Sequence, residues 1–229
     1  MLPVVKVIIP AFNEENGVGL VIQEIPKDVV AEIIVINNAS TDDTEKIARE
    51  AGATVLRELV PGYGRTCLRG IDYLIQSAIK PDIVVFLDAD HSDYPEEIHE
   101  LIRPIVEGRA DLVIGSRALG GKEKGSMTPQ QIFGNWLATR LLKWIYKVKF
   151  TDLGPFRAIR FSTLLELNME DKTYGWTVEM QLKAAKMGYR CVEVPVRYRK
   201  RIGFSKISGT VKGTVMAGYK ILYTLFKYV

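Results

Sequence analysis

Two aspartates separated by one small residue form the stretch of this chain best suited to chemistry. Asp88 and Asp90 flank Ala89 and directly follow the apolar run 83–87. Carboxylate oxygens are the ligands that hard divalent cations prefer, and Ala89 leaves room for both side chains to reach one ion. The same residues suit a capping turn, because Asp and Ser commonly precede a helix and residues 94–97 read as a helix start. The triplet alone leaves metal binding and a capping turn as open alternatives.

Further polar side chains follow other strands of the chain. The apolar runs 4–10 and 33–36 read as buried strands, and Asn13 and Asn37 come shortly after them. Because the carboxyl ends of parallel strands meet at one edge of an open sheet, we expect these residues to line one crevice with the aspartates. Such a crevice is the expected place for a nucleotide. The sequence lacks both the phosphate loop of P-loop enzymes and a three-glycine dinucleotide fingerprint.

Alternating strand and helix patterns predict an α/β fold in which helices cover both faces of a mostly parallel sheet. After residue 115 this alternation gives way to a glycine-rich loop at 120–126 and a long helical pattern. The expected strands are 4–10, 33–36, 53–56, 83–87, 110–115 and 189–196, with a turn or short strand at 151–158. The expected helices are 14–25, 42–51, 129–146, 177–187 and 209–228, with one more that follows 61–64 and runs to about 74 and another that starts near 94.

The composition is that of a globular protein, with 47% hydrophobic and 25% charged residues among 229. It excludes a disordered chain and allows one large domain. No run approaches the ~18 apolar residues of a membrane span, and the N-terminus lacks the features of a signal peptide. The two cysteines, Cys67 and Cys191, predict neither a disulfide framework nor a zinc site. We therefore expect a cytoplasmic location.

Charge is distributed unevenly along the chain. Residues 1–60 contain ten acidic and five basic side chains, whereas residues 180–229 contain eleven basic side chains and one acidic. A basic C-terminal region favours a nucleotide, a nucleic acid or an anionic lipid as partner, or is a solvated face. The helical patterns 129–146 and 209–228 combine apolar side chains with lysines, so each suits either core packing or a membrane interface.

Seven short motifs occur in order along the chain, at 9–14, 38–44, 62–64, 88–90, 115–117, 152–157 and 201–206. Together they resemble family 2 glycosyltransferases of the GT-A fold. Within that family, they are most similar to the dolichol-phosphate and polyprenyl-phosphate sugar synthases. Each motif is weak alone, but their conjunction is specific and favours the metal interpretation of the two aspartates. The resemblance implies an inverting transferase that uses one nucleotide sugar and Mg²⁺ or Mn²⁺.

The resemblance also implies roles for individual residues. Asp88 would contact the nucleotide, Asp90 would ligate the cation bridging the diphosphate, and both are candidate metal ligands. Ser92 stands where related synthases can place another polar ligand. Arg117 and segment 201–206 would neutralise the diphosphate from the other side. The expected catalytic residues are Asp90, Glu179 and Arg201, and the expected nucleotide-binding residues are Pro10, Ala11, Asn13, Glu14, Asn37, Gly64, Asp88, Ala89, Asp90, Arg117, Arg201, Ser205 and Lys206. We expect a domain of residues 1–206 with a nucleotide-binding half (1–117) and an acceptor half (118–206), followed by a C-terminal amphipathic helix (207–229).

The acceptor decides whether the reaction needs a general base. A polyprenyl phosphate is already anionic near neutral pH, whereas a hydroxyl acceptor must lose a proton, for which Glu179 is the candidate. Glu179 also suits a purely structural role, because acidic side chains favour the first turn of a helix. A third interpretation is a nucleotide-sugar-binding protein without turnover.

Two departures from the family pattern limit what the resemblance implies. Asn37 replaces the usual acidic residue that reads the base, so uracil and guanine both remain open. The membrane-spanning C-terminal helices of some members are also absent from the sequence. A lipid acceptor would then be met by surface helices, at the cytoplasmic face of the membrane. No nucleic-acid partner is expected, and the sequence predicts neither the sugar nor the oligomeric state.

Overall fold

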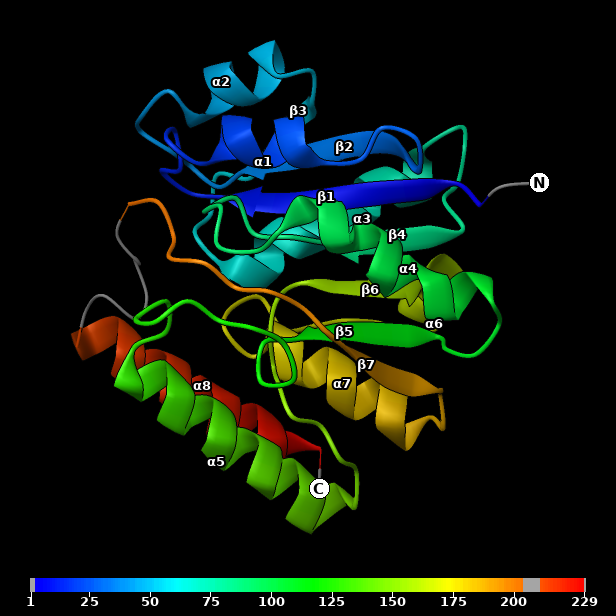
Figure 1. The fold of residues 1–229 in the computed structure, drawn as a ribbon, viewed down its shortest axis with the longest axis vertical. Helices are drawn as coiled ribbons and strands as arrows, with labels where there is room; N and C mark the ends of the chain where they lie inside the picture. The colour runs from blue at the N-terminus through cyan, green and yellow to red at the C-terminus, as the bar shows by residue number, and fades with distance from the viewer. Residues whose placement is uncertain (1–2, 204–210, 229) are drawn as a thin grey trace.

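The computed structural model describes residues 3–203 and 211–228. At its centre lies a seven-stranded sheet with the order β3-β2-β1-β4-β6-β5-β7 (Figure 1). The strands are β1 (Val5–Ala11), β2 (Val30–Asn37), β3 (Thr54–Arg57), β4 (Ile83–Phe86), β5 (Leu112–Ser116), β6 (Arg157–Arg160) and β7 (Cys191–Pro195). β6 runs antiparallel to β4 and β5, and the other neighbouring pairs are parallel. The prediction of a mostly parallel sheet is confirmed.

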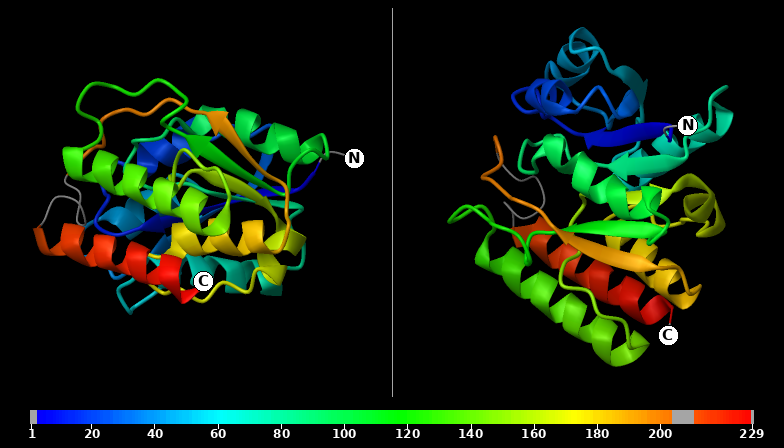
Figure 2. Two further views of the ribbon diagram at one scale, coloured as in Figure 1. Left: turned by 90° about the horizontal axis from the view of Figure 1, so that it is seen from below. Right: turned by 45° about the vertical axis from the view of Figure 1, so that its right-hand side comes forward.

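Helices cover both faces of this sheet, as the sequence predicts (Figure 2). Successive strand residues point to opposite faces, so Ile8 of β1 belongs to one core while Val7 and Ile9 belong to the other. Apolar side chains of α3 and α7 pack into the first core, and those of α1 and α4 into the second. The helices are α1 (Val18–Glu24), α2 (Thr44–Glu50), α3 (Tyr63–Gln76), the short 3-10 helix η1 (Pro95–Glu97), α4 (Ile98–Val106), α5 (Pro129–Tyr146), α6 (Phe161–Glu166), α7 (Trp176–Lys186) and α8 (Val211–Lys227).

The first helix starts four residues later than its apolar pattern predicts. α1 begins at Val18, not at Glu14, because residues 14–17 form a turn in which the Glu14 carbonyl accepts hydrogen bonds from Gly17 and Val18. Asn13 enters this turn with a left-handed φ of 53°. The chain therefore turns sharply at the end of β1, and this turn places Glu14 at the carboxyl edge of the sheet.

The segment expected as a turn or short strand at 151–158 is an irregular stretch followed by the start of a short strand. It leads into β6, which pairs antiparallel with β4 and β5 and thereby joins the two parts of the sheet. α6 follows directly and was not predicted. A four-residue strand and a six-residue helix are too short to carry a clear hydrophobic period, so their formation depends on their neighbours in the fold.

α5 and α8 lie side by side at the end of the molecule opposite β3 (Figures 1 and 2). The hydroxyl of Tyr146, the last residue of α5, donates a hydrogen bond to the Leu225 carbonyl of α8. Leu142 and Leu225 are fully buried in the core shared with α7. One side of each helix is thus packed onto the domain. Among residues 3–203 and 211–228, no helix is both long enough and apolar enough to cross a bilayer.

Candidate active site

The turns that follow β1, β2 and β4 are joined to one another at the carboxyl edge of the sheet. The Asn13 backbone N–H donates to Ser40 Oγ at 3.0 Å, and Asn13 Oδ1 accepts from the Thr41 N–H at 2.8 Å. The start of α1 lies directly against the turn after β4 that contains Asp88 and Asp90, which we call the aspartate turn. A Cβ atom added at Gly17 would lie only 2.6 Å from the Ala89 carbonyl oxygen. The structure therefore brings the three predicted polar clusters together around one edge.

Each of these three turns contains one non-glycine residue in the left-handed backbone region. They are Asn13 (φ 53°), Ala39 (φ 57°) and His91 (φ 62°). For residues with a Cβ atom this conformation costs about 1–2 kcal/mol, although asparagine tolerates it better than alanine. Such strain collects where the surrounding structure fixes a backbone for function. Its occurrence in all three turns supports the assignment of the candidate active site to this edge of the sheet.

Asp90 is buried and held by several donors. Its Oδ1 accepts from the Ser92 N–H at 3.0 Å and from Ser92 Oγ at 2.5 Å, and its Oδ2 lies 3.1 Å from Nη1 of Arg201. The guanidinium group of Arg201 also donates from Nη2 to Glu14 Oε1 at 2.6 Å. Arg201 thus neutralises two carboxylates from the turns that follow β4 and β1.

The Asp88 side chain accepts fewer hydrogen bonds than that of Asp90. Its Oδ1 accepts one hydrogen bond of 3.1 Å from the hydroxyl of Tyr63, the first residue of α3. Burial and the neighbouring charge of Asp90 raise the pKa of Asp88 to about 7. A cation bound beside Asp88 would reduce its repulsion with Asp90 and so stabilise the ionised carboxylate.

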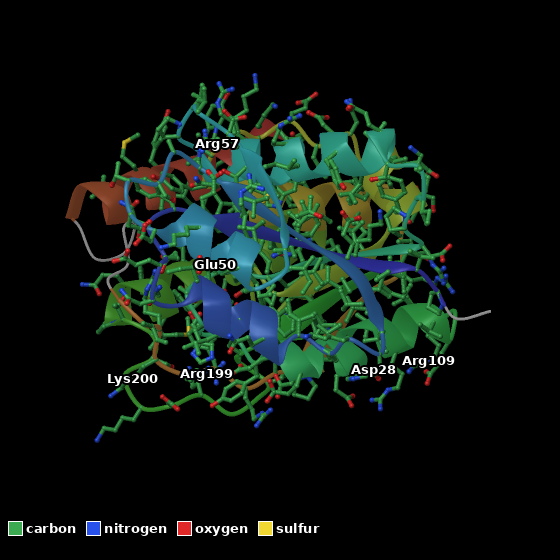
Figure 3. The ribbon with its side chains drawn as sticks, turned by 90° about the horizontal axis from the view of Figure 1, so that it is seen from above. Asp28, Glu50, Arg57, Arg109, Arg199 and Lys200 are labelled. Atoms are coloured by element: carbon green, nitrogen blue, oxygen red, sulfur yellow. The ribbon has the colours of Figure 1, made fainter. Side chains whose placement is uncertain are left out.

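The segment 197–203, which we call the strap, runs over the aspartate turn. The Arg199 N–H donates to the Ser92 carbonyl and the Ile202 N–H to the Asp90 carbonyl, both at 2.9 Å. Arg199 pairs with Glu24 of α1 at 2.5 Å, whereas Lys200 is exposed (Figure 3). The strap therefore fixes the position of Arg201. The predicted ligands Ser205 and Lys206 lie outside the described residues.

Arg117 occupies a different setting from the one expected for a free diphosphate ligand. It forms a two-pronged ion pair with the buried Asp152, at 2.9 Å from Nε and 2.6 Å from Nη2, and its guanidinium carbon lies 5.0 Å from the centre of the Tyr198 ring. This pairing depresses the pKa of Asp152 against the effect of burial. A diphosphate contact from Arg117 remains a prediction, and it would have to compete with Asp152.

The other predicted nucleotide-binding residues lie at the same edge of the sheet. Their backbone or side-chain groups already form contacts within the protein. Pro10 and Ala11 end β1 and pair with β2. Asn37 donates to Glu45 Oε2 at 3.0 Å and accepts from the Ser40 N–H at 3.0 Å, so both ends of its amide serve the turn. Gly64 lies against the 171–173 loop, where a Cβ atom would meet the Asp171 carbonyl oxygen at 2.0 Å. Their roles in reading a base or a ribose remain predictions.

The Glu179 side chain is buried, and both of its carboxylate oxygens accept hydrogen bonds. It is 0% exposed and accepts from the N–H groups of Glu170 (3.0 Å) and Asp171 (2.7 Å), from Lys183 Nζ (2.7 Å) and from the Tyr228 hydroxyl (2.9 Å). These contacts tie α7 to the 170–171 loop and to the C-terminal end of the chain. Within the described part of the chain these contacts give Glu179 a structural role, and a role as general base stays a prediction.

Sequence reasoning did not single out Asp93. Its side chain is buried at 3% exposure, and neither carboxylate oxygen has a hydrogen-bond partner within the described part of the chain. Burial, and after it the charge of Asp88, raises the pKa of Asp93 well above its ordinary value. Its place three residues after Asp90 was the available signal, but an aspartate in a polar turn is too common to stand out.

The chemistry of the carboxylate pair fits a divalent cation that arrives with a diphosphate. The described residues contain no group of three or more His, Cys, Asp or Glu side chains arranged to hold a metal by themselves. Magnesium is commonly held by one or two carboxylates together with substrate phosphates and water, without an all-protein cage. Asp88 and Asp90 supply such a pair, and Ser92 orients the second of them.

We expect Glu179→Gln to lower the free energy of unfolding by about 3 kcal/mol, because an amide leaves buried donors and Lys183 without a charged acceptor. Urea unfolding measures the loss, and Glu107→Gln, which removes an exposed carboxylate, is the control. If the variant keeps its stability but loses turnover selectively, Glu179 acts in the reaction and its structural role is wrong.

We expect Asp88→Asn to stabilise the fold at pH 8 by about 1–3 kcal/mol, with a gain that shrinks toward pH 4. The native pKa of about 7 lies above the ordinary value of 3.8. Between these values the native state binds a proton that the unfolded state releases, so the wild-type chain loses stability as pH rises through this window. Urea unfolding at both pH values checks this, with the exposed Asp72→Asn as control. A gain that is equal at pH 4 and pH 8 contradicts the account.

The fold and parts of the sequence have relatives among known proteins. The chain is similar to a glucosyl-3-phosphoglycerate synthase from Mycobacterium tuberculosis, solved with Mn²⁺, UDP and phosphoglyceric acid, with a TM-score of 0.79. That match has 22% sequence identity and covers 99% of this chain and 78% of the other, so it bears on the fold alone.

Curated relatives are closer in sequence. An uncharacterized glycosyltransferase of Mycobacterium tuberculosis is 34% identical over 93% of this chain and 94% of its own length. An undecaprenyl-phosphate mannosyltransferase of Micrococcus luteus is 32% identical over 91% of this chain and 89% of its own, and a polyprenol monophosphomannose synthase of Mycolicibacterium smegmatis is 27% identical over 89% and 81%. The family described as glycosyl transferase family 2 matches residues 6–167. With the sheet and the paired aspartates in place, these matches show that the chain is a glycosyltransferase of family 2 with the GT-A fold.

Proposed function

We propose that this glycosyltransferase moves a hexose from a UDP- or GDP-linked sugar to a polyprenyl phosphate at a membrane surface, with inversion at the anomeric carbon. The observation that carries the proposal is the pair Asp88 and Asp90 at the end of β4, faced by Arg201 on the strap. Carboxylates bind divalent cations, and a guanidinium group binds phosphate oxygens. Here the guanidinium group of Arg201 is in direct contact with the carboxylate of Asp90. This combination suits a sugar diphosphate.

Asp88 and Asp90 are the residues that would hold a Mg²⁺ or Mn²⁺ ion. Structural neighbours crystallised with Mn²⁺ or Mg²⁺ and UDP support this choice of ions. When bound, the ion supplies positive charge next to the diphosphate leaving group. Arg201 serves the same end from the protein side, because its guanidinium already lies at this place, held by the strap. A preorganised cation favours the state in which negative charge builds on the leaving group.

The choice of a phosphate acceptor is supported by the names of the relatives and by the burial of Glu179, the candidate base for a hydroxyl acceptor. Two relatives are named an undecaprenyl-phosphate mannosyltransferase and a polyprenol monophosphomannose synthase. A phosphate acceptor is anionic near neutral pH and needs no proton removed before it attacks. The hydroxyl alternative depends on Glu179, which is buried against four donors. No described contact favours that alternative.

An exposed apolar surface on α5 and α8 supports contact with a membrane. α5 exposes Phe133 (61%), Trp136 (52%) and Trp144 (72%), and α8 exposes Tyr219 (63%) and Phe226 (56%). Basic side chains accompany them, since Arg140 and Lys143 are exposed on α5 and Lys227 on α8. Aromatic rings flanked by cations suit the headgroup region of an anionic bilayer. Such contact would bring a lipid-linked phosphate to the protein.

A donor screen tests the transfer reaction. Wild-type protein with Mn²⁺, a short polyprenyl phosphate and a panel of UDP- and GDP-sugars is expected to form one sugar-phosphate lipid, detected by mass. Asp90→Ala is expected to lower the rate at least about 100-fold because it removes a charged ligand of the cation and diphosphate.

Asp72→Asn serves as the matched loss of a carboxylate on the surface of α3 and is expected to keep full turnover. Full activity of Asp90→Ala in the presence of EDTA would contradict the metal assignment. Transfer to water or to a sugar hydroxyl, with none to the lipid phosphate, would contradict the acceptor.

Liposome flotation tests the membrane surface. We expect wild-type protein to float with vesicles rich in phosphatidylglycerol, and Trp144→Ser to weaken this partition about 10-fold through the lost apolar contact. Ile79→Ser removes a similarly exposed apolar side chain away from α5 and α8 and is expected to float normally. Equal flotation of both variants, or none of the wild type, would show that this surface does not bind lipid.

A further inference from the structure

We infer that Tyr63 is a positioning residue that orients the Asp88 carboxylate toward the cation, an inference that rests on the proposed function. The Tyr63 hydroxyl lies 3.1 Å from Asp88 Oδ1. Among the described residues it is the one hydrogen-bond donor to that side chain, whereas Asp90 has Ser92 and Arg201. The orientation of Asp88 therefore depends on a single phenol.

The backbone on both sides of Tyr63 is held firmly. Gly62 donates from its N–H to Asn38 Oδ1 at 2.9 Å, and Gly64 and Arg65 donate to carbonyl groups of the 171–173 loop at 3.2 and 3.1 Å. The 171–173 loop also lies close to Gly62, where an added Cβ atom would be 2.4 Å from the Lys172 carbonyl oxygen. These contacts fix the start of α3, so the tyrosine ring reaches Asp88 from a rigid base.

The chemical consequence follows from the number of oxygens on a carboxylate. A hydrogen bond to Oδ1 restrains rotation of the Asp88 carboxylate and leaves Oδ2 to meet a cation. Partners that orient metal ligands in this way commonly contribute 10–100-fold to metal affinity. A phenol is well suited to the task here, because it donates without adding a positive charge that would compete with the ion.

The chain offers a matched control on the same helix. Tyr73 also lies on α3 and donates from its hydroxyl to a carboxylate, Glu32 Oε1, at 2.7 Å. Tyr73→Phe therefore removes the same chemical group and the same kind of hydrogen bond, but far along the helix from Asp88. A general effect of losing a tyrosine–carboxylate bond should affect both variants.

Titration with Mn²⁺ alone, followed by the electron paramagnetic resonance signal of the free ion, tests the inference without any turnover. We expect Tyr63→Phe to weaken Mn²⁺ binding roughly 10-fold or more and Tyr73→Phe to leave it unchanged. In an Asp88→Asn background, Tyr63→Phe should add no further loss, because the carboxylate it orients is gone.

Wild-type protein that binds Mn²⁺ while Tyr63→Phe binds it equally well would overturn the inference and leave the proposed function standing. An equal loss in Tyr73→Phe, or a full further loss from Tyr63→Phe in the Asp88→Asn background, would also overturn it. Because the ion is expected to arrive with a diphosphate, the titration is repeated with UDP present, and wild-type protein that binds no Mn²⁺ under either condition would overturn both the metal site and the inference.

Discussion

The repulsion between two carboxylates at the end of β4 is the constraint on which the rest of the site depends. Burial and the neighbouring charge of Asp90 together raise the pKa of Asp88. The protein relieves this repulsion in part with Arg201, which reaches Asp90 and Glu14 from the strap. A site assembled in this way is held ready for an added cation and an added anion together, as a metal-bound sugar diphosphate would supply.

The backbone around the pair is built to keep these charges in place. Gly17 lets α1 approach the aspartate turn, and Gly64 lets the 171–173 loop approach α3. Left-handed residues in the turns, such as Ala39, add strain that the surrounding contacts must offset. The two apolar cores, one on each face of the sheet, contribute the stability that offsets this strain.

Sequence patterns predicted those parts of the structure that depend on local periodicity. Residues 129–146 form a helix over the full predicted range, because a long apolar pattern is joined there by the capping pair Thr128 and Gln131. The aspartate triplet and its place after a buried strand were also read from local sequence. β6 could not be placed in the same way, since its four residues form a strand only through pairing with β4 and β5.

Contacts between residues distant in sequence were the parts that could not be predicted. The partner of Arg117 is Asp152, 35 residues away, and Glu179 is held by Tyr228, 49 residues away. The family resemblance implied a diphosphate ligand for Arg117, and the residue type suggested a general base for Glu179. Only the folded arrangement reveals that each is engaged by a partner, because a charged side chain is equally suited by its chemistry to a ligand and to an ion pair.

The most direct measurement of the central claim is a crystal of the protein soaked with Mn²⁺ and UDP and recorded at a wavelength where manganese scatters anomalously. The account predicts one strong anomalous peak within ligand distance of Asp88 and Asp90, with Arg201 turned from Asp90 toward the diphosphate. A peak elsewhere, or bound UDP with no peak at the aspartates and Arg201 still paired to Asp90, would contradict it.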